Sequence, residues 1–530
     1  MNKNILFVLC DQLRWDYLSC YGHPTLETPN IDWLAKNGVR FDRAYCQAPV
    51  CGPSRACIST GRYMSSQGAM WNTDPTSIGE KMMGEYLRPL GLKTAVIGKT
   101  DHRPDVATMK RLGIDPNSEI GRGIAHRDMD PYDLDNGIHP HGIFRPGSPP
   151  YNQYLQAQEY PGDNPWLDYA VSVVDDDGKV RDGWIWSNSK YPSRIPEEHS
   201  ESAYVTNRAI QFMTEVGTER WCLQLGYYKP HWPYVAPAPY HNLYCGDDML
   251  PANRTSAECQ NAHPVLDAFR QLRLSQVWSN ETARETIIPT YMGLVKQVDD
   301  QFGRLLTFMR AQGLLEETLI VFTSDHGDNL GDHWCGEKDL PYECSMRVPF
   351  LIYNPSTSAD ATRGTVENRF VEQIDLLPTF IETAGGDWTE HTHRLEGRSL
   401  HPLLRNDSDI SWRAYAISEL DFNGRDIWRE HMLDIPYQDA RGYVIRTEQW
   451  KYVLHERFRP QLYDMLNDPQ EQNDLGEVPD YETVRQELHE TLFHWLRNLK
   501  RRITVTPEEA HQRYGSEYED GIGILIGWWE

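Results

Sequence analysis

Short apolar segments that alternate with helix-like segments constrain this chain most. The apolar segments have the length of single buried strands, and they are residues 5–10 (ILFVLC), 93–98 (KTAVIG), 221–226 (WCLQLG) and 318–324 (TLIVFTS). Strands that are apolar on both sides are typical of parallel sheets, where helices cover both faces. The pattern therefore predicts an α/β fold with a large mixed, mainly parallel sheet covered by helices on both faces.

Helical periodicity appears between these strands. It predicts helices over residues 30–38, from about Ser54, and over 78–88, 199–216 and 286–312. Residues 103–198 are instead rich in Pro, Gly, Asp and Asn and show little periodicity. We expect this segment to be a long irregular excursion that builds a wall of the functional site.

The pattern changes near residue 410. Four short segments have the character of antiparallel strands, and a helix follows near 480–500; the strand segments are 414–420, 441–447, 450–455 and 459–465. We predict a main domain over 1–410, an antiparallel-sheet-plus-helix subdomain over 411–500 and a tail over 501–530. The tail ends in GIGILIGWWE. Because apolar aromatic ends are usually buried, we expect it to contact another subunit in a homo-oligomer, either a dimer or a tetramer.

The net charge of −25 limits the classes of partner. Nucleic-acid binding requires clustered Lys and Arg, and an acidic surface also repels anionic membranes. A small anionic substrate stays compatible if a few cations converge locally. The apolar run at 5–10 is too short for a signal sequence or a membrane span, and the ten cysteines form no CxxC pair. We therefore expect a cytoplasmic protein with reduced thiols.

Three polar segments fall at the ends of predicted strands or just before a predicted helix. Asp11 and Gln12 follow the first strand, Asp325 and His326 follow the strand at 318–324, and Cys51 precedes the helix from Ser54. Taken singly, such an Asp is usually a cap or turn former, and a buried Cys is usually a small hydrophobe. Together they offer two carboxylates, an imidazole and an amide, which are suitable ligands for a divalent cation.

The segment VCGPSRACISTGRY (50–63) makes the interpretation specific. Its Cys-x-Pro-Ser-Arg run, followed by Thr60-Gly61-Arg62, resembles the signature of the sulfatase family in the alkaline phosphatase superfamily. QAPVCGPSR, the WNT at 71–73 and the glycine-rich tail look more like the phosphonate monoester hydrolase branch. The resemblance implies an alkaline-phosphatase-like catalytic domain over 1–410 and a hydrolase for sulfate monoesters such as aryl sulfates, and for phosphonate monoesters or phosphodiesters.

The resemblance also implies that Cys51 is oxidised to formylglycine by a formylglycine-generating enzyme, which reads Pro53 and Arg55. The aldehyde hydrates to a gem-diol, whose two hydroxyls suit a two-step reaction. One hydroxyl, activated beside a metal ion, attacks sulfur or phosphorus. The other then loses its proton, so that the aldehyde re-forms and the anion is expelled.

Roles for the remaining residues follow from the same resemblance. The metal ligands implied are Asp11, Gln12, Asp325 and His326, together with modified Cys51. The residues implied at the substrate are Arg55, which holds the diol, Lys338, which contacts a substrate oxygen, His231, a general acid at the leaving group, and Asn72, which contacts substrate in the phosphonate monoester hydrolases.

Two positions depart from the family pattern. Many sulfatases have Gly-Lys-x-His, whereas this chain reads Gly-Lys-Thr-Asp-His over 98–102. Lys99 matches, but His102 is displaced by one residue, so Asp101 or Thr100 is an alternative for its role in breakdown of the intermediate. The second departure is at the implied metal site, where this chain has His326 and Gln12 and many sulfatases have an asparagine and an aspartate. A nitrogen ligand favours Mn²⁺, with Ca²⁺ as the alternative.

Other functional classes fit less well. A cysteine-dependent phosphatase needs a longer phosphate loop than the three residues between Cys51 and Arg55. A plain alkaline phosphatase would carry Ser or Thr as nucleophile. A catalytically inactive binding protein on the same fold would lack charged site residues, and the main ones are present. A dedicated phosphonate monoester hydrolase or phosphodiesterase, with sulfatase activity only as a side reaction, stays as the open alternative.

Overall fold

The main sheet has eight strands in the order β11-β2-β10-β9-β1-β8-β4-β5. The computed structural model of the protein describes residues 4–72, 74–101, 103–135, 149–407, 409–424 and 427–515. The strands of this sheet are β1 (Asn4–Asp11), β2 (Val39–Phe41), β4 (Lys93–Gly98), β5 (Pro131–Leu134), β8 (Trp221–Pro230), β9 (Thr318–Ser324), β10 (Phe350–Tyr353) and β11 (Thr365–Glu367).

The centre of the sheet is parallel. β1 lies between β8 and β9, and both pair with it in parallel; β4 continues the parallel order on the far side of β8. Only β10 runs antiparallel, to β9 on one side and to β2 on the other. The predicted mixed, mainly parallel sheet is confirmed. Its register brings the carboxyl ends of β1, β8, β9 and β4 to one edge.

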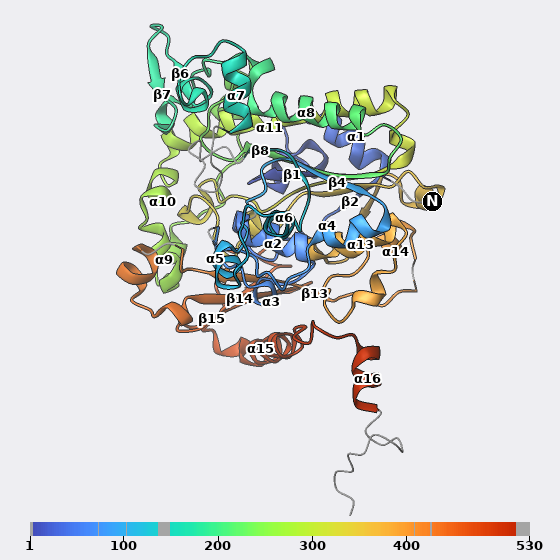
Figure 1. Ribbon diagram of the computed structural model, residues 1–530. Helices are drawn as coiled ribbons and strands as arrows, with labels where there is room; N and C mark the ends of the chain where they lie inside the picture. The colour runs from blue at the N-terminus through green and yellow to red at the C-terminus, as the bar shows by residue number, and fades with distance from the viewer. Residues whose placement is uncertain are drawn as a thin grey trace, which may run out of the picture.

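Helices cover both faces of the sheet (Figure 1). One face carries α1 (Pro29–Asn37), α8 (Glu201–Glu215) and α11 (Glu281–Ala311), and the other carries α2 (Cys51–Thr60), α4 (Met83–Leu87) and α13 (Leu376–Ala384). Alternate residues of β1 enter the two cores: Leu6 and Val8 pack on the α11 side, Phe7 and Leu9 on the α13 side. This alternation on a strand that is buried throughout explains its unbroken apolar sequence.

A second, antiparallel sheet lies at the C-terminal end of the chain. It has the order β13 (Tyr415–Asp421), β14 (Arg441–Thr447), β15 (Trp450–His455) and β16 (Gln461–Asp464). The helix α15 (Glu482–Arg497) packs on it through Leu488, Leu492 and Trp495, in a core that also holds Cys57. The predicted smaller α+β subdomain is therefore present, and it packs against α2. The boundaries at residues 410 and 500 stay predictions.

The prediction for residues 103–198 is wrong in part. The described portion contains α5 (Val106–Arg111), α6 (Glu119–Ala125), β5 at the edge of the main sheet, α7 (Pro150–Ala157) and the hairpin β6 (Ser172–Val174) to β7 (Val180–Asp182). These elements are too short to show a period in the sequence. Local caps start two of the helices: Asp105 accepts a hydrogen bond from the Thr108 amide, and Ser118 accepts one from the Gly121 amide.

Several helix boundaries also differ from the prediction. α2 begins at Cys51 rather than near Ser54, because Pro53 falls in the first turn, where a missing N–H costs nothing. The helix predicted over 78–88 is confined to α4 and a short 3₁₀ turn, Arg88–Leu90. α11 starts at Glu281, where the side chain of Asn280 accepts a hydrogen bond from the Thr282 amide.

The remaining described α-helices, and the strands of a small two-stranded sheet, are short. They are α3 (Met64–Gln67), α9 (Pro264–Arg270), α10 (Arg273–Trp278), α12 (Glu343–Met346), α14 (His401–Leu404), α16 (Pro507–Gly515), β3 (Ala44–Tyr45) and β12 (Val371–Glu372). The apolar tail at 521–530, predicted to contact another subunit, lies outside the described residues. No described helix combines the length and the apolar character needed to cross a bilayer.

Two glycines face each other at the end of β4, where it pairs with the middle of β8. Gly98 pairs with Gly226, and the amide of Lys99 donates a hydrogen bond to the carbonyl of Gly226 at 3.1 Å. Gly98 has φ +82°, and a Cβ there would clash with the Gly226 carbonyl oxygen. The close approach of these two backbones fixes the point at which the chain delivers Lys99 to the edge of the sheet.

We expect Gly98→Ala to lower the thermal unfolding midpoint clearly more than Gly113→Ala does. Gly113 has a similar φ of +74°, but a Cβ there would meet nothing within 4 Å. Both substitutions place alanine in the left-handed region, at a cost of about 1–2 kcal/mol, and only Gly98→Ala adds a backbone clash. Circular dichroism melting curves measure the difference. Equal decreases in the unfolding midpoint would show that the close approach of the two backbones does not affect stability.

Candidate active site

The site forms at the carboxyl edge of the parallel strands. Asp11 is the last residue of β1, Asp325 directly follows β9, and His231 and Lys99 directly follow β8 and β4. Each of these four side chains is at most 1% exposed. The carboxyl edge of the strands is where ligands gather in an open α/β sheet.

Cys51 enters this group from the first turn of α2. Its Sγ lies 3.1 Å from His326 Nε2, 3.2 Å from Lys338 Nζ and 3.6 Å from Asp11 Oδ1. Burial and the charge of Asp11 raise the pKa of the thiol well above its usual value. Because the thiolate is the reactive form of cysteine, the unmodified side chain is a poor nucleophile here.

Four side chains form a cluster that fits a divalent cation. Ligand atoms of Asp11, Cys51, Asp325 and His326 all lie within 4.8 Å of one another, and all four residues are buried. His326 Nδ1 lies 2.8 Å from the Gly327 carbonyl oxygen and so donates to it, which leaves the Nε2 lone pair directed into the cluster. Burial also lowers the pKa of His326, so the imidazole is neutral, as a metal ligand must be.

Gln12 lies beside this cluster, in a left-handed backbone conformation with φ +62°. The backbone N–H of Gln12 donates a hydrogen bond to Asp325 Oδ1 at 3.1 Å and so joins the ends of β1 and β9. Its side-chain oxygen accepts a hydrogen bond from Lys338 Nζ at 2.8 Å, and its side-chain nitrogen donates to Asp328. The structure thus places Gln12 next to the predicted ligands, with its amide oxygen engaged by Lys338.

Three buried cations surround the cluster. Arg55 donates from Nε to Asp325 Oδ2 at 2.8 Å and from Nη1 to the Lys99 carbonyl at 2.8 Å. Lys99 forms ion pairs with Asp11 and with Asp101. Burial alone would lower the pKa of Arg55, Lys99 and Lys338, but neighbouring negative groups outweigh it and raise all three pKa values. The cations therefore stay charged and provide a site for an anionic ester.

His231 and Lys338 form a hydrogen-bonded pair. His231 Nδ1 lies 2.7 Å from the Trp232 carbonyl oxygen, an acceptor, so this nitrogen carries the ring proton. His231 Nε2 then accepts from Lys338 Nζ at 3.1 Å. Burial and the charge of Lys338 hold the pKa of His231 well below its usual value. The transferable proton of the pair is on Lys338, next to Cys51.

The remaining site residues named from the sequence are Asn72, His102 and the two alternatives to His102. Asn72 Oδ1 accepts a hydrogen bond from the Gly52 amide at 2.8 Å, which places it at the first turn of α2. His102 lies outside the described residues. Asp101, the alternative to His102, is described: its Oδ2 lies 3.1 Å from Lys99 Nζ, and its φ is +51°. Thr100, the residue between Lys99 and Asp101 in the sequence, is buried.

Sequence reasoning assigned no role to two residues that hold the site in place. Ser54 Oγ donates to the Asp325 carbonyl at 2.7 Å and so joins α2 to the end of β9. Asp328 accepts hydrogen bonds from the Gln12 side chain and from the Tyr234 hydroxyl. Burial and the nearby Glu337 raise the pKa of Asp328 to about 7. The repeated acids in SDHGDNLGDH were the signal available for Asp328, and Ser54 had none beyond its place in the signature.

Comparisons with known proteins agree with this geometry. The model of the family described as Sulfatase matches residues 3–386, and that of the N-sulphoglucosamine sulphohydrolase C-terminal region matches residues 331–498. The chain is 30% identical to the multifunctional alkaline phosphatase superfamily protein PehA of Trinickia caryophylli, over 93% of this chain and 95% of that protein. It is 26% identical to an arylsulfatase of Clostridium perfringens, over 100% and 98%.

The fold has a solved counterpart. The phosphonate monoester hydrolase SpPMH from Silicibacter pomeroyi superimposes with a TM-score of 0.81 at 25% identity, covering 96% of this chain and 98% of that one. The alkaline-phosphatase-like architecture predicted from the sequence is confirmed by this match.

Proposed function

The chain belongs to the sulfatase family and is a hydrolase, and we propose that it cleaves sulfate monoesters, aryl sulfates among them, and also phosphonate monoesters or phosphodiesters. One observation carries the proposal: Cys51 lies in a buried cluster of Asp11, Asp325 and His326, with Lys99, Arg55 and Lys338 around it. A tetrahedral anionic ester is the kind of substrate that such a ring of cations attracts.

In this proposal Cys51 acts after oxidation to formylglycine, in a transient complex with the enzyme that makes this modification. The predicted ligands Asp11, Gln12, Asp325 and His326, with residue 51, would hold one divalent cation, Mn²⁺ by preference. That ion supplies positive charge which favours ionisation of a hydroxyl at position 51.

Residue 51 then reacts in two steps. Its first hydroxyl oxygen forms a bond to sulfur or phosphorus, and the bond from that atom to the alcohol oxygen breaks. The second hydroxyl next loses its proton, the C=O bond re-forms, and cleavage of the C–O bond expels sulfate, a phosphonate or, from a phosphodiester, a phosphate monoester. Addition of water to the aldehyde then restores the diol. Arg55, within hydrogen-bond distance of Asp325 and of the Lys99 carbonyl, keeps residue 51 and the acids in register.

The alcohol that leaves in the first step needs a proton. Lys338 carries a proton, and its ammonium group donates a hydrogen bond to His231 Nε2 in the structure. We assign to this pair the general-acid role predicted for His231, with Lys338 also contacting a substrate oxygen. Lys99 and its partner Asp101 are placed to act in the second step, where His102 was the sequence-based candidate. Asn72, hydrogen-bonded to Gly52 at the start of α2, would contact substrate next to residue 51.

A second candidate function is a dedicated phosphonate monoester hydrolase or phosphodiesterase with sulfatase activity only as a side reaction. The similarity in fold to the Silicibacter pomeroyi phosphonate monoester hydrolase favours it. Both functions use the same residues, because a singly charged tetrahedral centre with one leaving oxygen describes all these substrates.

The cell compartment and assembly rest on the sequence. All ten cysteines are free in the structure, and this supports our proposal of a cytoplasmic protein with reduced thiols. Assembly as a dimer or tetramer through residues 521–530 stays a proposal as well.

Peptide mass spectrometry and a substrate panel test the function directly. Co-expression with a formylglycine-generating enzyme should convert Cys51 to the aldehyde, seen as a mass loss on the peptide spanning the signature. The modified protein should then hydrolyse 4-nitrophenyl sulfate, a phenylphosphonate monoester and a bis-aryl phosphate diester, and their kcat/KM values rank the two candidate functions. Full activity with an unmodified thiol would overturn the formylglycine proposal.

We expect Cys51→Ser to release about one equivalent of phenol from an aryl sulfate and then to stop. Serine has a single hydroxyl, so the first transfer survives, but no second hydroxyl can expel the sulfate. Intact-protein mass spectrometry should show the sulfated serine. Cys51→Ala is the matched control and should release no phenol. Continuous turnover by Cys51→Ser near the rate of the modified enzyme would contradict the diol mechanism.

We expect His326→Asn to shift metal preference from Mn²⁺ towards Ca²⁺, because it removes the only nitrogen among the predicted ligands. Elemental analysis after reconstitution with equimolar Mn²⁺ and Ca²⁺ measures this without an activity assay. His263→Asn is the control: this buried imidazole contacts the Arg459 carbonyl and lies outside the cluster, so metal content should not change. An unchanged metal ratio in His326→Asn would refute the assigned ligand role.

A further inference from the structure

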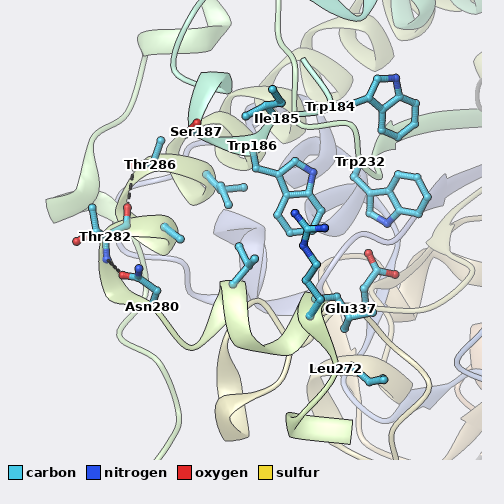
Figure 2. Close-up of a pocket in the computed structure, with 15 residues that line it drawn as sticks. Trp184, Ile185, Trp186, Ser187, Trp232, Leu272, Asn280, Thr282, Thr286 and Glu337 are labelled. Atoms are coloured by element: carbon cyan, nitrogen blue, oxygen red, sulfur yellow. Dashed lines mark hydrogen bonds between the residues drawn. The ribbon is translucent and has the colours of Figure 1, made fainter. Parts of the chain in front are cut away.

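A large cavity with tryptophan walls lies next to the reactive cluster. It has a volume of about 1090 Å³. One wall comes from residues 184–187 and Trp232. The other comes from α10 and the first turns of α11. In the view of Figure 2, Trp184 and Trp232, whose rings are in contact, lie on the right, and Thr282 and Thr286 lie on the left.

Two residues of the cavity wall are the direct neighbours of two site residues. Trp232 follows His231, and the two rings are 4.4 Å apart between centroids. Glu337 precedes Lys338, whose ammonium group donates to His231. His231 and Lys338 are the pair assigned to the leaving alcohol. The cavity wall is therefore one residue away from each member of the pair to which the leaving alcohol is assigned.

The lining is suited to an apolar group. Trp184 and Trp232 meet edge-on with centroids 5.8 Å apart, and Ile185, Leu274, Val277 and Ile287 complete an apolar surface. Arg273 and Glu337 are the charged residues among those that line it, and Glu337 is only 5% exposed and has its own partners. Tryptophan faces of this kind favour flat aromatic or alicyclic groups.

One polar group on this wall is left over. The indole Nε1 of Trp232 is buried and has no hydrogen-bond partner among the described residues. A buried N–H without an acceptor is costly and is usually explained by a ligand or a bound water. This N–H has almost no accessible surface, so it is closed off from the cavity, and the walls offer few polar partners. They do not suit a sugar, whose several hydroxyls would lose water and find few partners there.

On the basis of the proposed function, we propose that this cavity binds the alcohol part of the substrate and selects esters of large, uncharged, apolar alcohols with two or more fused rings. The volume supports the size class, since it is at the upper end of the range for sites that take drug-sized ligands and far exceeds the need of a single phenyl ring. Sulfated sugars of similar size are predicted to be poor substrates.

Filling the cavity from α11 tests the proposal. Thr286→Trp puts a large side chain into the space, and Thr307→Trp is the matched control on the same helix. Both threonines donate a side-chain hydrogen bond to the carbonyl four residues earlier, at 2.7 and 2.8 Å, but Thr307 is exposed and does not line the cavity. Thermal melting curves of the two variants show whether either one fails to fold.

With the modified enzyme, we expect Thr286→Trp to raise KM for pyren-1-yl sulfate by about tenfold or more, the loss expected when a ring or more of buried apolar surface is excluded. KM for 4-nitrophenyl sulfate should change by less than about threefold, and Thr307→Trp should change neither. Glucosamine 6-sulfate should be hydrolysed far more slowly than pyren-1-yl sulfate by the parent enzyme. Equal effects of Thr286→Trp on the two aryl sulfates, or faster hydrolysis of the sugar sulfate, would overturn the proposal.

Binding of the free alcohol separates this inference from the catalytic one. Calorimetric titration of Cys51→Ala protein with 1-hydroxypyrene requires no formylglycine and no turnover. Binding that is lost in the Cys51→Ala, Thr286→Trp double variant and kept with Thr307→Trp supports the cavity, even if no ester is hydrolysed and the proposed function fails. Absence of binding to the Cys51→Ala protein would overturn the cavity proposal, even if aryl sulfates are hydrolysed.

Discussion

Mutual neutralisation of buried charges at the edge of the sheet is the constraint on which the site depends. Asp11 and Asp325 are fully buried, and so are the cations that face them. Burial of any one of these charges alone would be prohibitive, whereas opposite charges with good hydrogen-bond geometry compensate each other. Burial opposes ionisation of Asp11, but Lys99 and its neighbours outweigh it and hold the pKa of Asp11 well below its usual value. Asp11 is thus ready as a ligand at neutral pH.

The sheet makes this neutralisation possible because the pairing of its strands brings together residues that are far apart in the sequence. Asp11 and Asp325 are separated by most of the chain, yet the Asp325 amide donates to the Cys10 carbonyl and the Gln12 amide donates back to Asp325. Ser54 adds a third connection by joining α2 to the same segment. The first turn of α2 and the ends of two strands therefore form one rigid unit. Catalytic groups held by such a unit lose little freedom when a substrate arrives.

The sequence was sufficient for the parts of the fold that follow a period. β1, β4, β8 and β9 are long enough and apolar enough to be recognised. β5 and the short helices before it were missed, since four to seven residues carry too little period. Side-chain pairings were also not predicted. The ion pair of Asp101 with Lys99 depends on a left-handed backbone conformation at Asp101 that the sequence does not indicate. The tryptophan cavity was missed for another reason, since Trp184 and Trp232 meet only through tertiary packing.

The helix α11 has two roles, and its residues divide between them. Ile287 belongs to the large hydrophobic core and also lines the cavity, so any change there alters folding stability and pocket shape together. Thr282 and Thr286 line the same cavity without being part of that core. Substitution at these two threonines would therefore change the shape of the cavity while the core residues of the same helix keep the protein folded.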